Sequence, residues 1–162
     1  MIAIVDYRAG NLTSVARALH FLEKPCQITS DPEELRRASR IIFPEVGAAG
    51  EAMAHLRRTG LDQLLWECIQ EGKPMLGICL GTQVILEHSE ENDTTCLGII
   101  AGNVKRFPED LRQDGKRLKI PHMGWNQWLF KKIILFFRGF LKGLSFILYT
   151  LIILKLLILV WP

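Results

Sequence analysis

The sequence predicts an α/β fold, in which a mostly parallel sheet carries helices on both of its faces. Short apolar runs alternate with helical stretches from the first residue onward, the order that βαβ units produce. The runs are continuously apolar, as in strands buried on both faces. A length of 162 residues, with 49% hydrophobic and 23% charged residues, suits one domain with a sizeable core.

The N-terminal elements follow in a regular order. Met1–Val5 is an apolar run typical of a strand, and Asn11–Leu22 repeats apolar residues along one helical face. A second short strand is predicted over Cys26–Thr29. The next helix is predicted to begin at Asp31, because a capping residue, a proline and two acids follow one another there. Arg40–Phe43 is the third predicted strand.

The central part adds two helices and one further strand. Helices are predicted near Glu51–Arg58 and Leu61–Glu71, and Gly60 and Gly72 end them. Pro74–Ile78 is the next predicted strand. Because open parallel sheets bind ligands at the carboxyl ends of their strands, we expect the functional site just after this strand.

Beyond Leu86 the pattern is weaker. Glu87–Asp93 is predicted to be an acidic surface loop. Gly98–Phe107 and Lys119–Ile120 resemble shorter strands, joined by a charged turn over Glu109–Lys116.

Charge divides the chain near residue 128. Residues 1–128 hold all 17 acidic residues and 15 of the 20 basic ones, a formal charge of −2. Residues 129–162 hold five basic residues and no acid, so the overall charge of +3 comes from this apolar tail. The first segment shows no basic cluster with interleaved aromatic residues, which argues against nucleic-acid binding.

The four cysteines predict neither a zinc site nor disulfides. They show no Cys-x-x-Cys spacing and have no accompanying histidine pair, so no metal or other cofactor is expected. The chain opens on a predicted strand and not on the basic lead of a signal peptide. We therefore expect a cytoplasmic protein with reduced thiols. The cysteines are Cys26, Cys68, Cys79 and Cys96.

Cys79 is the candidate nucleophile. It stands between the predicted strand and a helical pattern that begins at Leu80, where free backbone N–H groups favour an ionised sulfur. Gly77 and Gly81 flank it and suit a sharp turn that projects the side chain outward. The alternative is that Cys79 is a small core residue, as many free cysteines are.

Several segments together resemble the class I glutamine amidotransferases, and within them the glutaminase subunits of imidazole glycerol phosphate synthase. The resemblance covers residues 1–128 and implies a flavodoxin-like fold whose C-terminal part is missing. The matching segments are Asp6-Tyr7 with Gly10-Asn11-Leu12, Phe43 to Gly47, Gly77 to Gln83, and Lys119 to Asn126.

The resemblance implies the hydrolysis of glutamine to glutamate and ammonia. Cys79 corresponds to the nucleophile, and Gln83 to a residue that helps to hold the substrate. The N–H of Leu80 and the peptide between Val46 and Gly47 correspond to the donors that stabilise the oxyanion.

The resemblance also implies a partner. Ammonia passes to a cyclase subunit that makes imidazole glycerol phosphate and AICAR in histidine biosynthesis, and the two subunits form a heterodimer. The alternative is another amidotransferase of the class, for pyridoxal phosphate or anthranilate synthesis. The loop from Pro121 to Asn126 fits that alternative less well. The residues that resemble the partner-facing surface are Pro121, His122, Met123, Gly124, Trp125 and Asn126.

The sequence departs from the family pattern at Glu45, at Thr82, at Arg8-Ala9 and in its missing catalytic pair. Glu45 stands where the family usually has glycine, which hinders a backbone flip at the oxyanion strand. The His-x-Glu pair that follows the partner loop in the family is absent, since no histidine follows His122. The other histidines, His20, His55 and His88, lie in helical patterns or in the acidic loop, so we expect an inactive chain.

Residues 129–162 form a second, aberrant segment after the incomplete amidotransferase domain. Their Leu, Ile, Phe and Lys content suggests a frameshift near codon 128 in an A/T-rich gene. The competing interpretation is a membrane anchor over Leu144–Trp161, about 27 Å long as a helix against a hydrocarbon core of about 30 Å. A third interpretation is a non-catalytic protein that binds the cyclase.

Overall fold

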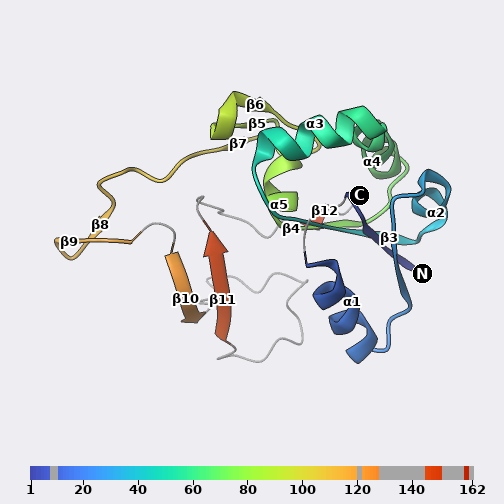
Figure 1. Ribbon diagram of the computed structural model, residues 1–162, viewed down its shortest axis with the longest axis horizontal. Coiled ribbons are helices and arrows are strands. Elements are labelled where there is room, and N and C mark those ends of the chain that lie inside the picture. The colour runs from blue at the N-terminus through green and yellow to red at the C-terminus, as the bar shows by residue number, and fades with distance from the viewer. Residues whose placement is uncertain (8–10, 120–121, 128–144, 151–158, 161–162) are drawn as a thin grey trace. The chain divides into compact units, whose positions relative to one another are not determined.

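The computed structural model describes residues 1–7, 11–119, 122–127, 145–150 and 159–160 (Figure 1). The chain forms two compact units, one of residues 1–106 with 154–162 and one of residues 107–153.

A five-stranded sheet organises the first unit. The four strands of this sheet that lie within residues 1–79 run parallel to one another, as predicted. The third strand is two residues longer than predicted, because Pro44 and Glu45 continue its pairing with the fourth. A short antiparallel strand lies at one edge. In spatial order the strands are β12 (Leu159–Val160), β4 (Met75–Cys79), β3 (Arg40–Glu45), β1 (Ile2–Val5) and β2 (Cys26–Thr29).

Five helices connect and cover these strands, close to the predicted ranges. The side chain of Asp31 accepts a 2.7 Å hydrogen bond from the N–H of Glu33, so it caps the second helix as predicted. Gly60, at φ 72°, ends the third helix in the left-handed conformation and immediately precedes the fourth. The helices are α1 (Leu12–Phe21), α2 (Pro32–Arg37), α3 (Ala49–Thr59), α4 (Leu61–Gln70) and α5 (Leu80–Val84).

Apolar side chains pack on both faces of the sheet. The larger cluster joins alternate residues of β1 and β3, including Val5 and Phe43, to α2, α3, α4 and α5. The smaller cluster, built on Ile4, Leu19 and Ile42, joins the opposite face to α1. Figure 1 shows α3 and α5 on one side of β3 and β4, and α1 on the other.

The prediction of an acidic surface loop over Glu87–Asp93 is wrong in part. Residues 88–104 form a small three-stranded sheet, in which Ser89 is fully buried and the N–H of Glu90 donates to the carbonyl of Val104. The predicted strand over Gly98–Phe107 shrinks to two residues, since only they reach a partner strand. The elements are β5 (His88–Ser89), η1 (Glu91–Asp93), β6 (Thr94–Thr95) and β7 (Asn103–Val104).

The described residues of the second unit form two strand pairs. The predicted charged turn is a hairpin, in which Asp114 and Gly115 both take positive φ, as a two-residue turn requires. Lys119 lies outside any strand, contrary to prediction, while Ile120 lies outside the described residues. The strands are β8 (Arg112–Gln113), β9 (Lys116–Arg117), β10 (His122–Gln127) and β11 (Ser145–Thr150), and the last two are antiparallel.

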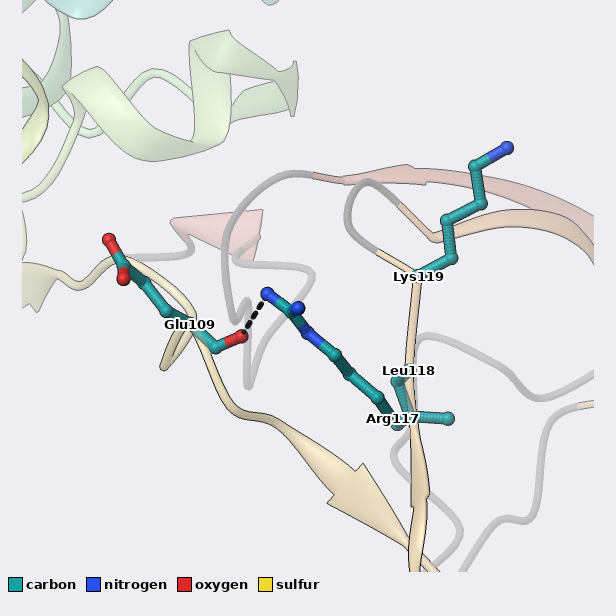
Figure 2. A pocket seen from close by; sticks show the side chains of 4 residues that line it. All are labelled: Glu109, Arg117, Leu118 and Lys119. Atoms are coloured by element: carbon teal, nitrogen blue, oxygen red, sulfur yellow. Dashed lines mark hydrogen bonds between the residues drawn. The ribbon is translucent and has the colours of Figure 1, made fainter.

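A shallow hollow of about 340 Å³ lies in this unit (Figure 2). The guanidinium of Arg117 donates a 3.0 Å hydrogen bond to the main-chain oxygen of Glu109 across it. The carboxylate of Glu109 and the amine of Lys119 both point away from this bond in Figure 2. The polar groups that line this hollow therefore do not converge on one point.

Within the part of the chain that the structure describes, no helix is long and apolar enough to cross a membrane. The candidate span Leu144–Trp161 lies mostly outside that part. Ser145–Thr150, which it includes, form strand β11 and not a helix.

Candidate active site

Cys79 is the last residue of β4, and α5 begins at Leu80. Its backbone has φ 57° and ψ −118°, a conformation that is rare for any residue except glycine. Such strain costs about 1–3 kcal/mol and clusters at functional sites. The Cys79 residue is exposed, whereas Leu80 is buried. This is the strand-to-helix elbow that the sequence predicted.

The two glycines that flank Cys79 are required by packing. A Cβ atom on Gly81 would lie 1.9 Å from the carbonyl oxygen of Phe43, and one on Gly77 would lie 2.9 Å from the backbone of Gly81. Both distances are shorter than any real carbon contact, and both involve backbone atoms. Only glycine at these two positions therefore allows β4 and α5 to pack this closely against β3 and against each other.

The predicted oxyanion strand lies beside the elbow. Glu45 pairs in register with Cys79, and Val46 and Gly47 follow directly. The N–H of Val46 donates to the hydroxyl of Tyr7 at 3.3 Å, and that hydroxyl donates to the carbonyl of Val46. Gly47 has φ 111°, which a side chain would strain.

Glu45 is the buried acid of this region. It is 1% exposed, and neither carboxyl oxygen has a hydrogen-bond partner among the described residues. Burial raises the pKa of Glu45 to about 8. The sequence marked this position as unusual, but only the structure shows that its carboxyl group is buried without a partner among the described residues.

Tyr7 lies between this strand and helix α3. Burial raises the pKa of Tyr7 to about 12, with a further contribution from the negative charge of Glu45. The Tyr7 ring meets the ring of His55 edge-on, with 5.8 Å between centroids. The guanidinium of Arg58 lies 2.9 Å from Nδ1 of His55. These residues line a hollow of about 420 Å³ with Val46, Ala48, Glu51, Ala52 and Ala54.

Gln83 lies in helix α5 of the elbow, and Glu91 contacts the start of α3, the helix that follows β3. Gln83 is 6% exposed on α5, and its side-chain oxygen has no partner among the residues described. The carboxylate of Glu91 accepts a 2.8 Å hydrogen bond from the N–H of Ala49. It thereby caps α3, whose own N-cap residue, Ala48, has no side-chain acceptor. No local sequence pattern predicts this contact, because 42 residues separate the partners.

The remaining predicted residues lie elsewhere. His20 is exposed on α1, and His88 Nε2 lies 3.3 Å from the carboxylate of Asp93. Of the predicted partner loop, Pro121 lies outside the described residues and the rest form β10 of the second unit. In the described ranges, no three His, Cys, Asp or Glu residues gather where they could bind a metal.

The sequence identifies the family, and a solved structure shares the fold. The sequence profile of the family described as Glutamine amidotransferase class-I matches residues 3–144. A crystal structure of a glutamine amidotransferase superposes with a TM-score of 0.58, at 19% identity, over 65% of this chain and 57% of that one. The chain therefore belongs to the class I glutamine amidotransferases.

Within this family, the similar curated relatives are imidazole glycerol phosphate synthase subunits HisH. Identity is 54% over 128 residues with that of Nitratidesulfovibrio vulgaris strain DP4, and 52% over 139 residues with that of Maridesulfovibrio salexigens. The alignments cover 78% and 85% of this chain, and 60% and 66% of the relatives. The chain thus spans about 60% of the length of the relatives it matches.

Proposed function

We propose that this chain is the glutamine-binding, nucleophile-bearing part of a glutaminase subunit that feeds ammonia to a cyclase in histidine biosynthesis. The observation that carries the proposal is the strained Cys79 at the end of β4, with two glycines on which the surrounding backbone depends. The similarity to HisH subunits supports the choice of reaction.

The proposed reaction begins at the side-chain amide of glutamine. The sulfur of Cys79 attacks the amide carbon, and the electron pair of the carbonyl moves onto oxygen. Backbone N–H groups of Leu80 and of the Val46–Gly47 peptide stabilise this oxyanion. The amide nitrogen takes up the proton that the Cys79 thiol loses, and collapse of the oxyanion then breaks the carbon–nitrogen bond, releases ammonia and leaves a glutamyl thioester. Water then hydrolyses the thioester to glutamate and restores the thiol.

Proton transfer is the step for which this chain offers no assigned group. Of its four histidines, His55 contacts Arg58 and His88 contacts Asp93, while His20 is exposed on α1 and His122 lies in β10 of the second unit. We therefore propose that the 162-residue chain forms the thioester slowly and has little or no steady-state turnover. The lack of an assigned group for proton transfer also favours a second proposal, in which the chain is a non-catalytic protein that binds the cyclase.

A glutaminase assay with and without an added cyclase subunit tests both proposals, and Cys79→Ser provides the control. Ammonia release that depends on Cys79 supports the glutaminase and excludes the binding-only protein. Binding of the cyclase without any labelling of Cys79 by glutamine supports the binding-only protein. A cytoplasmic heterodimer is the expected assembly, and size-exclusion chromatography of the mixed subunits measures it.

A further inference from the structure

We propose that the carboxyl group of Glu45 takes the proton from the Cys79 thiol and passes it to the amide nitrogen of glutamine. This role rests on the proposed function, because the proton has to move only if Cys79 attacks an amide. It gives a catalytic task to a side chain that departs from the family pattern. It also supplies the proton transfer for which the histidines of the chain offer no assigned group.

Glu45 and Cys79 lie side by side at the ends of neighbouring strands. β3 and β4 run parallel, and Glu45 is the register partner of Cys79. Adjacent strands of a sheet are about 4.8 Å apart. Alternate residues of a strand point to the same face, and Ile41, Phe43 and Met75 all belong to the larger apolar cluster. By the same alternation, positions 45 and 79 lie on this face, the one that α5 covers.

The electrostatic surroundings of Tyr7 bring the same two groups together. Burial raises the pKa of Tyr7 to about 12, with a further contribution from Glu45 and smaller ones from Cys79 and Glu51. Glu51 is exposed on α3, whereas Glu45 is buried. The carboxyl group of Glu45 and the sulfur of Cys79 therefore both lie within electrostatic reach of one hydroxyl group.

Both carboxyl oxygens of Glu45 are available to accept a proton. The residue is 1% exposed, and neither oxygen has a hydrogen-bond partner among the described residues. A buried polar group without a partner opposes folding, and such groups cluster at functional sites. Burial raises the pKa of Glu45 to about 8, so this carboxyl group changes its charge near the pH at which a general base works best.

The proposed proton path is closed. As the sulfur of Cys79 bonds to the amide carbon, the carboxylate of Glu45 takes the thiol proton. It gives this proton to the amide nitrogen, the carbon–nitrogen bond breaks, and ammonia leaves. The carboxylate next takes one proton from the water that attacks the thioester, and it returns this proton to sulfur as the carbon–sulfur bond breaks. The new carboxyl group of the product releases its own proton to solvent.

The test uses a diazoketone analogue of glutamine, with –CO–CHN₂ in place of the side-chain amide. The sulfur of Cys79 bonds to the diazo carbon, this carbon takes up the thiol proton, and N₂ leaves. Labelling is read at each cysteine by peptide mass spectrometry at pH 7. We expect Glu45→Gln to slow the labelling of Cys79 by at least about tenfold. Alkylation by iodoacetamide, which loses iodide and takes up no proton, is expected to change by less than about twofold.

Glu51→Gln is the matched control. Its carboxylate also acts on Tyr7 but is exposed, so this substitution is expected to leave both rates unchanged. Formate gives a second readout that a purely structural role of Glu45 would not move. In Glu45→Gly the lost side chain leaves room for formate, which is expected to restore part of the diazoketone labelling. In Glu45→Gln the side chain fills that room, and formate is expected to have no effect.

Each outcome separates the role of Glu45 from the proposed function. Equal diazoketone labelling of wild type and Glu45→Gln overturns the role of Glu45 and leaves the proposed function intact. Slower labelling that formate does not restore in Glu45→Gly also overturns the proton transfer. No labelling of Cys79 in the wild type overturns both. Cys68 and Cys96 are buried and report folding of each variant in the same experiment.

A measurement on the wild-type chain covers the case in which the variants of Glu45 do not fold. In a spectrum of the chain labelled with ¹³C at glutamate Cδ, alkylation of Cys79 is expected to shift the signal of Glu45. The signal of Glu67, on α4, is expected to stay unmoved. An unmoved Glu45 signal contradicts the inference.

Discussion

At the scale of single residues, the site combines strain with burial. Cys79 has a positive φ, and Glu45 beside it is a carboxyl group without a hydrogen-bond partner in the described ranges. Both features oppose folding, by about 1–3 kcal/mol for the backbone strain alone. The close packing of Gly77 and Gly81 against neighbouring backbone holds the elbow in this form.

The burial of Glu45 predicts an unusual dependence of stability on pH. Its pKa rises from 4.5 to about 8 on folding, so the folded state binds more protons than the unfolded state between these values. The free energy of unfolding therefore falls as pH rises from 4.5 through 8, by at most about 1.4 kcal/mol for each unit. Urea unfolding at pH 5, 6.5 and 8 measures this decline. Glu45→Gln is expected to flatten it, and an unchanged decline in that variant contradicts the assignment.

The close packing around Gly81 predicts that a single added methyl group lowers stability severely at this position. Gly81→Ala places a carbon against the carbonyl of Phe43 and is expected to cost more than about 3 kcal/mol, above the usual range for overpacking. Thermal unfolding measures the loss. Gly60→Ala is the control, because Gly60 also has positive φ on a helix junction but nothing lies within 4 Å of its added carbon. It is expected to cost about 1 kcal/mol. Similar losses in the two variants contradict the steric account.

At the scale of elements, helix ends are stabilised in two different ways. Asp31 caps α2 from within the local sequence, so the sequence alone predicted where that helix begins. Glu91 caps α3 from a distant segment, so the start of α3 at Ala49 lies two residues before the predicted start. Local capping is visible in a sequence, and long-range capping is not.

The cap of α2 yields a measurable prediction. Asp31→Ala removes the acceptor for the N–H of Glu33 and is expected to lower stability by about 1 kcal/mol. The urea midpoint measures the change. Asp62→Ala is the matched control, since Asp62 lies in the first turn of α4, whose cap residue is a glycine without a side chain. A loss in the control as large as in Asp31→Ala contradicts the capping role.

At the scale of the whole molecule, the four cysteines of the first unit differ in their exposure to solvent. Cys79 is exposed, Cys26 is half-buried, and Cys68 and Cys96 are buried, with burial raising the pKa of each of the last two thiols. The charge of Lys73 opposes this effect at Cys68 without cancelling it.

This arrangement predicts the order of alkylation by iodoacetamide. Cys79 is expected to react first and Cys26 second, while Cys68 and Cys96 react at least about tenfold more slowly until denaturant is added. Peptide mass spectrometry over time measures all four rates together. Rapid early modification of Cys68 or Cys96 indicates that the first unit does not hold the packed structure described above.

The sequence alone was enough to predict the parallel α/β fold of the first 79 residues and the position of the elbow at Cys79. These features depend on local patterns: apolar runs, a cap at Asp31, and glycines around Cys79. The relation between Tyr7 and Val46, the burial of Glu45, and the strands formed in the supposed loop at His88 were decided by tertiary structure. Each depends on contacts between residues about 15 to 40 positions apart, which no local pattern encodes. Only when β3 lies between β1 and β4 do these groups meet, because the strand order brings Val46 beside Tyr7 and Glu45 beside Cys79.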